Sequence, residues 1–534
     1  MTPQIRSSTV ESQYDVVVVG HGVAGAAAAI EAADRGARVL IIDSAYGGGA
    51  SALSGGVVYA GGGTSTQREA GIEDSPEAML AYLSQEVGGA VSPSTLKRFC
   101  DESPAMIEWL KSHAVPFAGG IPSYKTSYPT DDYYLYYSGN ESAYPYRDHA
   151  RPAPRGHRVV AKGLASGKVL WNRLAAAAAD RGVEFLPVAR ATSVVVDDGR
   201  VVGLRYQVLP RSARGARLHR VLSRGFGKIG NWMPMLSKPF TDIADGIFQR
   251  RSLTVQVRTP SVVLAAGGFI YNREWVAKYA PLFTEISPLG TPADDGSGIA
   301  LGIAARGAVD YMSNVTAWRF LSPPSGLLNG VAVGMNGARI ANEDLYGATL
   351  GDHLMRDHGG NGWAFYDADS WRAARQQIVP QTKAFQRLQA FPLFLLGAKR
   401  GRTLEQLASR TGVDPAGLLS TIKAYNSGIA SGDGDPAHKA PAYSSPVATA
   451  PFVAINISAK NALYFPLPGL TLGGLKVDEQ TGEVLRADGS IVNGLYAAGR
   501  SAVGVCSNAY ISGLSLADGV FSGRRAGHHA AGGC

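Results

Sequence analysis

The N-terminal part of the chain alternates short apolar runs with an alanine-rich stretch, an order that predicts an α/β unit. Tyr14 to Val19 (YDVVVV) is a β-branched apolar run typical of a buried parallel strand. Ala26 to Arg35 predicts a helix, and Ala37 to Ile42 (ARVLII) predicts a second strand. Two later runs, Ser261 to Phe269 and Gly494 to Arg500, repeat the strand-and-glycine pattern. We therefore expect a sheet that takes strands from distant parts of the chain.

The turn between the first strand and the helix carries the dinucleotide-binding pattern GxGxxG. Gly20 permits a tight turn, Gly22 leaves room for a pyrophosphate, and Gly25 allows close packing of helix on strand. Val23 and Ala24 belong to this turn, and the N-terminus of the helix that follows offers free N–H groups that suit phosphates. The alternative is a glycine turn in an α/β fold that binds no cofactor.

An acid and a second glycine-rich loop favour FAD over NAD. Asp43 follows the second strand, near the spacing at which an acid accepts hydrogen bonds from ribose hydroxyls. The loop at residues 47–56 offers N–H and hydroxyl groups along an extended cofactor. An NAD domain is usually contiguous, whereas this fold closes with the C-terminus. The expected flavin contacts in this part are Asp43, Ser44, Ser51, Ala52, Ser54, Gly55 and Gly56.

Composition excludes several other classes of protein. Apolar residues make up 45% and charged residues 18%, an ordinary globular balance, and Gly is high at 66 residues. Three cysteines form neither a disulfide framework nor a CxxC metal site, which suits a reducing, cytoplasmic compartment. The polar start at residues 1–13 lacks the apolar core of a signal peptide. No apolar run is long enough to predict a membrane span.

Most of the net charge of +8 lies in one segment, residues 211–251, where nine Lys/Arg face two Asp. Because the rest of the chain is close to neutral, we expect no nucleic-acid partner. Arginines recur there every three or four residues beside Leu218, Val221 and Leu222, which predicts a basic and apolar helical excursion from a β-meander. Such a segment suits peripheral membrane contact; the alternative is a solvated or dimer-contact segment.

The ordered motifs resemble the fumarate reductase and succinate dehydrogenase flavoprotein superfamily over nearly the whole chain. They are the GxGxxG start, Ser51 to Gly56, VVLAAGGF at 262–269, Asp294-Asp295-Gly296, GARIANE at 337–343, TLGG at 471–474 and the run 494–527. The resemblance implies an α/β (α+β overall) architecture with a Rossmann-like, discontinuous FAD-binding domain and an inserted α+β catalytic domain. It adds as flavin contacts Ala266, Gly267, Asp295, Gly499, Arg500, Ser515 and Leu516.

The implied domains are a tail at 1–13, FAD-binding parts at 14–275 and 450–534, and a catalytic domain at 276–449. The FAD is expected to be non-covalent, because no His lies in Ser51 to Gly56. Ser515 opens the last helix, where the family places backbone N–H groups at the flavin; a simple N-cap by Ser515 is the other interpretation.

Departures from the family pattern argue against dicarboxylate chemistry. Cys506 stands at the position of the family's substrate-binding His, Tyr510 at that of its Arg, and Gly347 near that of a second Arg. A dicarboxylate needs cationic anchors, so a fumarate-reductase-like ene-reductase is a weak alternative. A flavin-binding protein without turnover is another.

What remains resembles the 3-ketosteroid dehydrogenase branch. Tyr510-Ile511-Ser512-Gly513 is similar to the Tyr-x-Ser of the Δ4-(5α)-dehydrogenases, whereas Δ1-dehydrogenases usually have Gly at the Ser512 position. Tyr346 sits where both groups place a third tyrosine. The resemblance implies Tyr510 as donor to the ketone oxygen, Ser512 as proton acceptor and Tyr346 as proton relay. It implies FAD-dependent dehydrogenation of an apolar ketone, a 3-ketosteroid, with Δ1 regiochemistry as the alternative and the electron acceptor left open.

Eight tyrosines crowd the segment from Tyr124 to Tyr146. Aromatic faces with terminal hydroxyls suit a flat apolar ligand. An ordinary packed loop explains them equally well.

Overall fold

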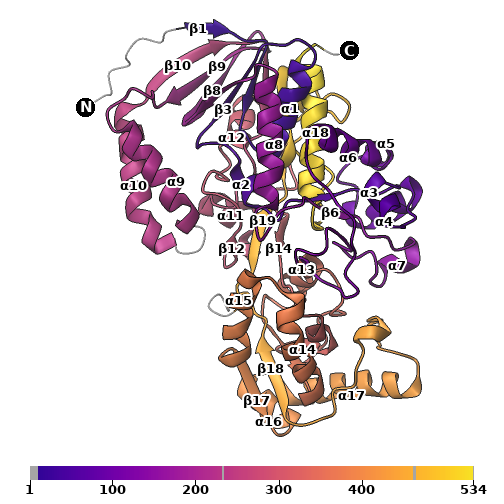
Figure 1. Ribbon diagram of the computed structural model, residues 1–534. Helices are drawn as coiled ribbons and strands as arrows, with labels where there is room; N and C mark the ends of the chain where they lie inside the picture. Colours follow the sequence, from indigo (N-terminus) through magenta and orange to yellow (C-terminus); the bar gives the residue numbers. More distant parts are fainter. Residues whose placement is uncertain (1–9, 231–233, 461–464, 533–534) are drawn as a thin grey trace.

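The protein has two lobes joined by a pair of adjacent strands. This computed structural model describes residues 10–230, 234–460 and 465–532. The upper lobe in Figure 1 holds the large sheet and both ends of the described chain, and the lower lobe holds β17, β18 and helices α14 to α17.

A ten-stranded, parallel-rich sheet forms the upper lobe, and its centre is the dinucleotide-binding unit. β2 (Val16–Val19) lies between β11 (Ser261–Leu264) and β3 (Val39–Asp43), all parallel, and all four valines of β2 are buried. β22 (Ile491–Ala497) pairs parallel with β11, so the C-terminal part of the chain supplies a central strand. The predicted α/β fold and its closure by the C-terminus are confirmed. The outer strands are β7 (Glu184–Pro187), β8 (Ala189–Asp197), β9 (Arg200–Val208), β10 (Leu253–Arg258), β1 (Val10–Gln13) and β21 (Glu483–Leu485).

The first and last helices pack directly on each other behind this sheet. α1 (Val23–Ala33) lies against α18 (Leu514–Ala530), with α8 (Ser166–Asp180) beside α1. Small residues allow this approach, because a Cβ at Gly523 would overlap the carbonyl oxygen of Ala24. The contact ties the start of the chain to its end.

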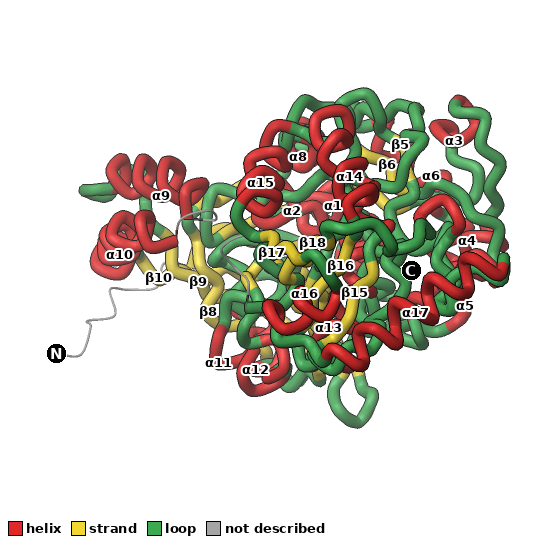
Figure 2. The backbone as a smooth tube through the Cα atoms, turned by 90° about the horizontal axis from the view of Figure 1, so that it is seen from below, coloured by secondary structure: helices red, strands yellow, loops and turns green. Residues whose placement is uncertain are grey.

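The basic segment forms a helical hairpin between β9 and β10. α9 (Ala216–Gly230) and α10 (Pro234–Arg251) stand at one end of the sheet, as Figure 2 shows from below. Buried Phe248 and Ala216 pack on the sheet, and His219 Nδ1 lies 3.2 Å from the Tyr46 hydroxyl. Leu218 and Val221 are exposed, whereas Leu222 is buried. The side chains of 226–237 lie outside the described part of the chain.

The lower lobe is a four-stranded antiparallel sheet flanked by helices. Its strands run in the order β15 (Val331–Gly334), β16 (Gly362–Tyr366), β18 (Phe452–Asn456) and β17 (Ala398–Gly401). β18 completes this sheet, so the lobe extends past the expected boundary at residue 449. The helices are α13 (Gly347–Asp357), α14 (Ala368–Gln381), α15 (Ala384–Leu395), α16 (Leu404–Thr411) and α17 (Pro415–Ser431).

Two antiparallel strands carry the chain between the lobes. β14 (Val315–Ala317) leaves the upper lobe and β19 (Pro468–Thr471) returns to it, with Val315 opposite Thr471.

A small sheet in the upper lobe supports the tyrosine-rich segment; it consists of β4 (Val57–Tyr59), β6 (Gly156–Arg158) and β5 (Leu135–Tyr136). No helix in the described ranges is long and apolar enough to cross a membrane.

Gly25→Ala should disrupt the contact between α1 and its strand turn, because the added Cβ would overlap the carbonyl oxygen of Gly20. We expect a loss of about 1–3 kcal/mol in the free energy of unfolding, together with lower flavin content after purification. Thermal melts and the ratio of flavin to protein absorbance measure both.

Gly246→Ala is the matched control. Gly246 lies within α10, and a Cβ there meets no atom within 4 Å. It should leave the flavin ratio unchanged and raise stability slightly, because Ala favours helix more than Gly does. Equal melting shifts for both variants would contradict the packing argument.

Candidate functional site

The turn before α1 forms a cradle at the carboxyl end of the central strands. Gly20 adopts a φ of +103° and packs on the carbonyl of Ala265, so a side chain is excluded there. Ser51 Oγ accepts a hydrogen bond of 3.1 Å from Val23 N, and a Cβ on Gly22 would come within 3.3 Å of this hydroxyl. The first-turn amides of α1, including that of Ala24, point out of the helix end. A hydroxyl beside free amides and the positive end of a helix suits a pyrophosphate.

The Asp43 carboxylate is held at the end of β3 by backbone amides. It accepts hydrogen bonds from His21 N and Ala45 N, both 2.8 Å. Its remaining lone pairs are available to a ribose. Burial lowers the pKa of His21 to about 4, so this ring is neutral beside the cradle. Ser44 follows directly on the strand.

The loop from Ser51 to Gly56 continues from the cradle across α2 (Gly49–Leu53), which contains Ala52. Ser54 Oγ donates to Ser51 O at 2.7 Å and accepts from Gly56 N at 3.1 Å. The Tyr128 hydroxyl donates to Gly55 O at 3.0 Å. The loop is therefore fixed from both sides along the path predicted for an extended cofactor.

An ion pair lies next to Ala266 and Gly267 at the end of β11. Arg500 Nη2 binds Asp294 Oδ1 at 2.6 Å, and a Cβ on Gly267 would approach this same oxygen to 2.6 Å. Arg500 Nη1 is buried and has no hydrogen-bond partner in the part of the chain that the structure describes. An orphaned buried donor beside the cradle fits an additional ligand group.

The structure does not bring Asp295 to this group. Asp295 is exposed, and its carboxylate accepts a hydrogen bond from Ser297 N at the start of α12 (Ser297–Ala304). Its neighbour Asp294 is the buried acid, because Gly267, Gly268 and Arg500 surround it. Asp295 therefore stays a predicted flavin contact, and the buried carboxylate next to Gly267 is that of Asp294.

The N-terminus of α18 lies beside the cradle. The helix begins at Leu514 with Gly513 as N-cap at a φ of +93°, so Ser515 and Leu516 belong to the first turn. An N-cap by Ser515 is therefore wrong, whereas free amides at this helix end are available as expected. Gly499 N donates to Ser522 Oγ at 2.9 Å, which binds the end of β22 to α18.

Ser512 lies in the turn just before α18, and tyrosines lie near its hydroxyl. The Tyr136 hydroxyl lies 3.3 Å from Ser512 Oγ. Burial raises the pKa of Tyr346 well above its ordinary value, and the nearby Ser512 and Trp318 side chains partly oppose this shift. Tyr510 packs edge-on against Trp318, with ring centroids 5.1 Å apart, and burial also raises its pKa. The structure thus brings Tyr346, Tyr510 and Ser512 together.

Tyr136 is the residue of this cluster that sequence reasoning did not single out. It is one of eight tyrosines in its segment, and no local spacing marks it. β5 pairs with β6, and this pairing buries Tyr136 and aims it at Ser512. Other tyrosines of the segment serve structure, since Tyr134 lies under the Arg158 guanidinium and Tyr124 packs on Tyr133.

A buried polar network holds Tyr346 in place. Tyr346 N donates to Asn140 Oδ1 at 2.6 Å, and Asn140 Nδ2 donates to Glu86 Oε1 at 2.8 Å. The Tyr82 hydroxyl donates to the same oxygen. Burial raises the pKa of Glu86 to about 7, so this carboxyl carries a proton in much of the neutral range.

The arginines near the cluster are engaged elsewhere. Arg500 pairs with Asp294, and Arg319 donates to Phe465 O at 2.8 Å and Ser458 O at 3.1 Å. A side chain at Gly347 would overlap Phe320, which explains why no arginine fits there. Cys506 Sγ donates to Asp518 Oδ2 at 3.5 Å and is buried. The cluster therefore suits an uncharged ligand.

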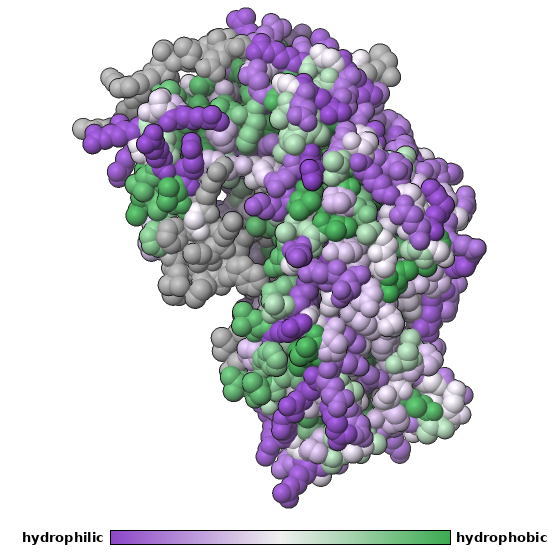
Figure 3. Space-filling model, viewed as in Figure 1, coloured by the Kyte–Doolittle hydropathy of each residue, from purple (hydrophilic) through white to green (hydrophobic). Residues whose placement is uncertain are grey.

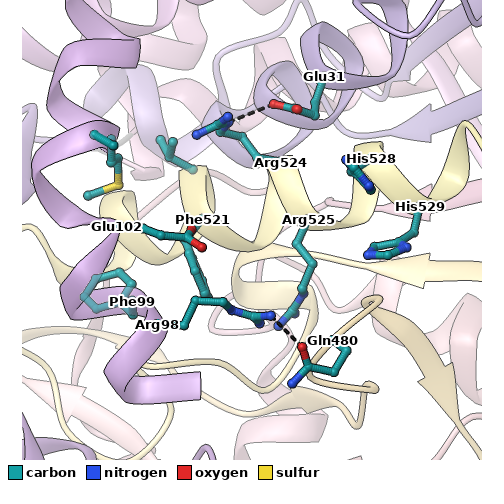
Figure 4. Close-up of a pocket in the computed structure, with 13 residues that line it drawn as sticks. Glu31, Arg98, Phe99, Glu102, Gln480, Phe521, Arg524, Arg525, His528 and His529 are labelled. Atoms are coloured by element: carbon teal, nitrogen blue, oxygen red, sulfur yellow. Dashed lines mark hydrogen bonds and ion pairs between the residues drawn. The ribbon is translucent and has the colours of Figure 1, made fainter. Parts of the chain in front are cut away.

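A cavity of about 430 Å³ lies away from these residues, between α18 and α5 (Pro93–Asp101). In Figure 4 Arg524 binds Glu31, and Arg98 binds Gln480, so its cations already have partners. Within the described ranges no group of three or more His, Cys, Asp or Glu is placed to hold a metal ion.

Residues 15–516 match the family described as FAD binding domain. The chain belongs to this family. It is an FAD-dependent oxidoreductase, as predicted, and the cradle, Asp43 and the orphaned Arg500 donor fit the cofactor.

Named relatives of this flavoprotein act on steroids. It is 38% identical to a 3-oxo-5-alpha-steroid 4-dehydrogenase of Comamonas testosteroni over 91% of this chain and 92% of that protein. It is 27% identical to a 3-oxosteroid 1-dehydrogenase of Mycobacterium tuberculosis, over 93% and 94% of the two chains. The 3-ketosteroid-delta4-(5alpha)-dehydrogenase of Rhodococcus jostii RHA1, solved with 4-androstene-3,17-dione, aligns at a TM-score of 0.82 and 30% identity over 98% of both chains.

Glu86→Gln should change how stability depends on pH. The folded pKa of about 7 lies above the model-peptide value of 4.5, so the folded state binds more protons between these values and wild-type stability falls as pH rises through them. The glutamine has no proton to lose. At pH 8 the variant should be more stable than wild type by up to about 3 kcal/mol.

Below pH 4 both proteins carry a neutral side chain at this position, so the difference should vanish. Urea unfolding at several pH values measures it. A stability difference independent of pH would contradict the assignment of a protonated carboxyl to Glu86.

Proposed function

We propose that this flavoprotein oxidises a 3-ketosteroid by introducing a double bond between C4 and C5, as a 3-ketosteroid Δ4-(5α)-dehydrogenase. The observation that carries the proposal is the Ser512 hydroxyl, 3.3 Å from the Tyr136 hydroxyl and near the buried side chains of Tyr346 and Tyr510. The names of the relatives in Comamonas and Rhodococcus support the substrate class. A neutral pocket suits a neutral ketone.

Tyr510 and Ser512 act on different parts of the steroid, the C3 carbonyl and the neighbouring carbon C4. Tyr510 donates a hydrogen bond to the C3 carbonyl oxygen, where negative charge develops, and Ser512 accepts the proton that leaves C4. The hydrogen on C5 leaves with its electron pair, and bound FAD supplies the acceptor for that hydride. Two electrons and two hydrogens leave the steroid, and one C=C bond forms.

Serine alone is a weak base, so Ser512 needs a route for the proton. Tyr346 passes it on, as the sequence predicts, and Tyr136 provides a second hydroxyl at 3.3 Å from Ser512 Oγ. Burial keeps the phenols of Tyr136 and Tyr510 protonated, because it raises their pKa values. They therefore act as hydrogen-bond donors at neutral pH.

Regiochemistry depends on Ser512. A Δ1-dehydrogenase remains the alternative, and the similarity to the mycobacterial 1-dehydrogenase motivates keeping it. In the domain division that we propose, residues 276–449 together with β18 cap the substrate, and residues 14–275 with the remainder of 450–534 bind FAD.

We also propose that the α9–α10 hairpin contacts a membrane surface from the cytoplasmic side. Nine Lys/Arg face two Asp in residues 211–251, and both acids are already paired, Asp242 with Lys238 and Asp245 with Arg190. Exposed Leu218, Val221 and Ile243 accompany these charges. Such a surface suits anionic lipids.

Adding a 3-keto-5α-steroid without oxygen should bleach the flavin absorbance rapidly in the wild type. Ser512→Ala should slow bleaching by about 100-fold or more, because it removes the proton acceptor, and Tyr136→Phe by about tenfold. Both variants should keep bound flavin. Stopped-flow absorbance gives the rates, and product analysis after one turnover distinguishes Δ4 from Δ1.

Tyr133→Phe is the matched control, since this residue lies on the same segment but packs on Tyr124. It should bleach at the wild-type rate. Rapid bleaching of Ser512→Ala would rule out the assigned role, and oxidation of the flavin of reduced enzyme by an unsaturated acid would favour the ene-reductase instead.

Replacing residues 213–250 by a short Gly/Ser turn should weaken pelleting with anionic lipid vesicles, because about seven positive charges are removed. Bleaching by the steroid in detergent solution should not change. Unaltered pelleting would exclude the hairpin as a membrane contact.

A further inference from the structure

Helix α15 in the lower lobe presents apolar side chains to solvent along one stripe. Leu388, Phe391 and Leu395 are spaced by three and four residues and are exposed by 77%, 46% and 72%. Leu396, directly after the helix, is exposed by 71%. Single exposed leucines are ordinary, but a contiguous group marks an interaction surface.

The side of α15 that packs on the lower lobe is also apolar. Leu393 and Phe394 are buried in the core of the lower lobe, and Phe394 stacks on Trp371 with ring centroids 4.5 Å apart. Packing on the core explains why the inner side chains of α15 are apolar. It does not explain the exposed apolar stripe, which suits a binding partner outside the lobe.

The surroundings of the stripe are strongly basic. Residues 368–402 contain seven Lys/Arg and one acid, Asp369, which already pairs with Arg372. Arg375, Arg400 and Arg402 are exposed. Two copies of this surface would repel each other, whereas an anionic lipid surface complements both its charge and its apolar stripe.

The stripe and the hairpin lie on the same side of the molecule. In Figure 3 hydrophobic residues gather at the left of the lower lobe, over α15, and at the left of the upper lobe, over α9 and α10. The lobe and the hairpin thus offer two separate basic and apolar contacts to one surface.

The start of α15 is attached to the loops that lead to Ser512. Lys383, its N-cap, pairs with Asp131 at 2.7 Å, and Gln386 Nε2 donates to Tyr128 O at 3.3 Å. The Tyr128 hydroxyl in turn donates to Gly55 O in the loop from Ser51 to Gly56. The carbonyl oxygen of the neighbouring Ser127 accepts a hydrogen bond of 3.4 Å from the Tyr136 hydroxyl. A surface bound to α15 is therefore close to the reacting residues.

We propose that the outer face of α15 docks on an anionic lipid surface and holds the mouth of the active site against it. The apolar side chains enter the interface between headgroups and acyl chains, and the surrounding arginines bind the lipid phosphates. An apolar ketone dissolved in the membrane then reaches the flavoprotein without crossing water; this last role rests on the proposed function.

The test is co-sedimentation of the full-length holoenzyme with vesicles of phosphatidylcholine containing phosphatidylglycerol. The wild type should pellet, and the triple variant Leu388→Gln, Leu395→Gln, Leu396→Gln should lose about tenfold or more in vesicle affinity. Its flavin content and its bleaching rate with steroid in detergent solution should stay at wild-type values. Pelleting therefore tests docking independently of the proposed reaction.

The matched control removes three exposed apolar side chains from the upper lobe, Val196→Gln, Ile303→Gln and Ile491→Gln, and should pellet like the wild type. Equal pelleting of wild type and α15 variant would overturn the proposal, as would a wild type that stays in the supernatant. A dimer by light scattering that the α15 variant converts to a monomer, with pelleting unchanged, would instead make this face an interface between copies.

Discussion

The backbone pairing of Ser512 with Ser138 is the constraint on which the site depends. Ser512 N donates to Ser138 O at 3.1 Å, and Ser138 Oγ donates to Ser512 O at 3.0 Å. Tyr59 N binds Gly513 O at 3.1 Å immediately beyond. These bonds fix the backbone conformation between β22 and α18. The Ser512 hydroxyl is therefore preorganised next to Tyr136.

The residues around Ser512 are uncharged, and this determines which ligands the cluster can bind. A charged anchor in a buried pocket needs a partner or carries a desolvation cost of several kcal/mol. In this molecule Asp294 neutralises Arg500, and backbone carbonyls hold Arg319. The phenols of Tyr136, Tyr346 and Tyr510 and the Ser512 hydroxyl remain in the cluster, and such groups interact by hydrogen bonding rather than by charge.

The sequence predicts those parts of the fold whose signals are local. β2, the glycine turn, α1 and β3 follow one another within thirty residues, and each has a residue pattern of its own. A motif marks Tyr510 and Ser512 in the sequence, and the structure places both near Tyr346. Tyr136 was missed because strand pairing across distant segments aims it. Asp294 and Asp295 are adjacent in sequence, and only the packing of Gly267 and Arg500 decides which acid is buried.

The pairing of β14 with β19 places the two ends of the lower lobe side by side. The chain enters and leaves the lower lobe through neighbouring strands, with Ala317 opposite Gly469. The two ends of the lower lobe are therefore adjacent. Replacing the lobe would not change the order of strands in the cofactor-binding sheet. The lower lobe can therefore change in sequence or size while the FAD-binding sheet keeps its topology.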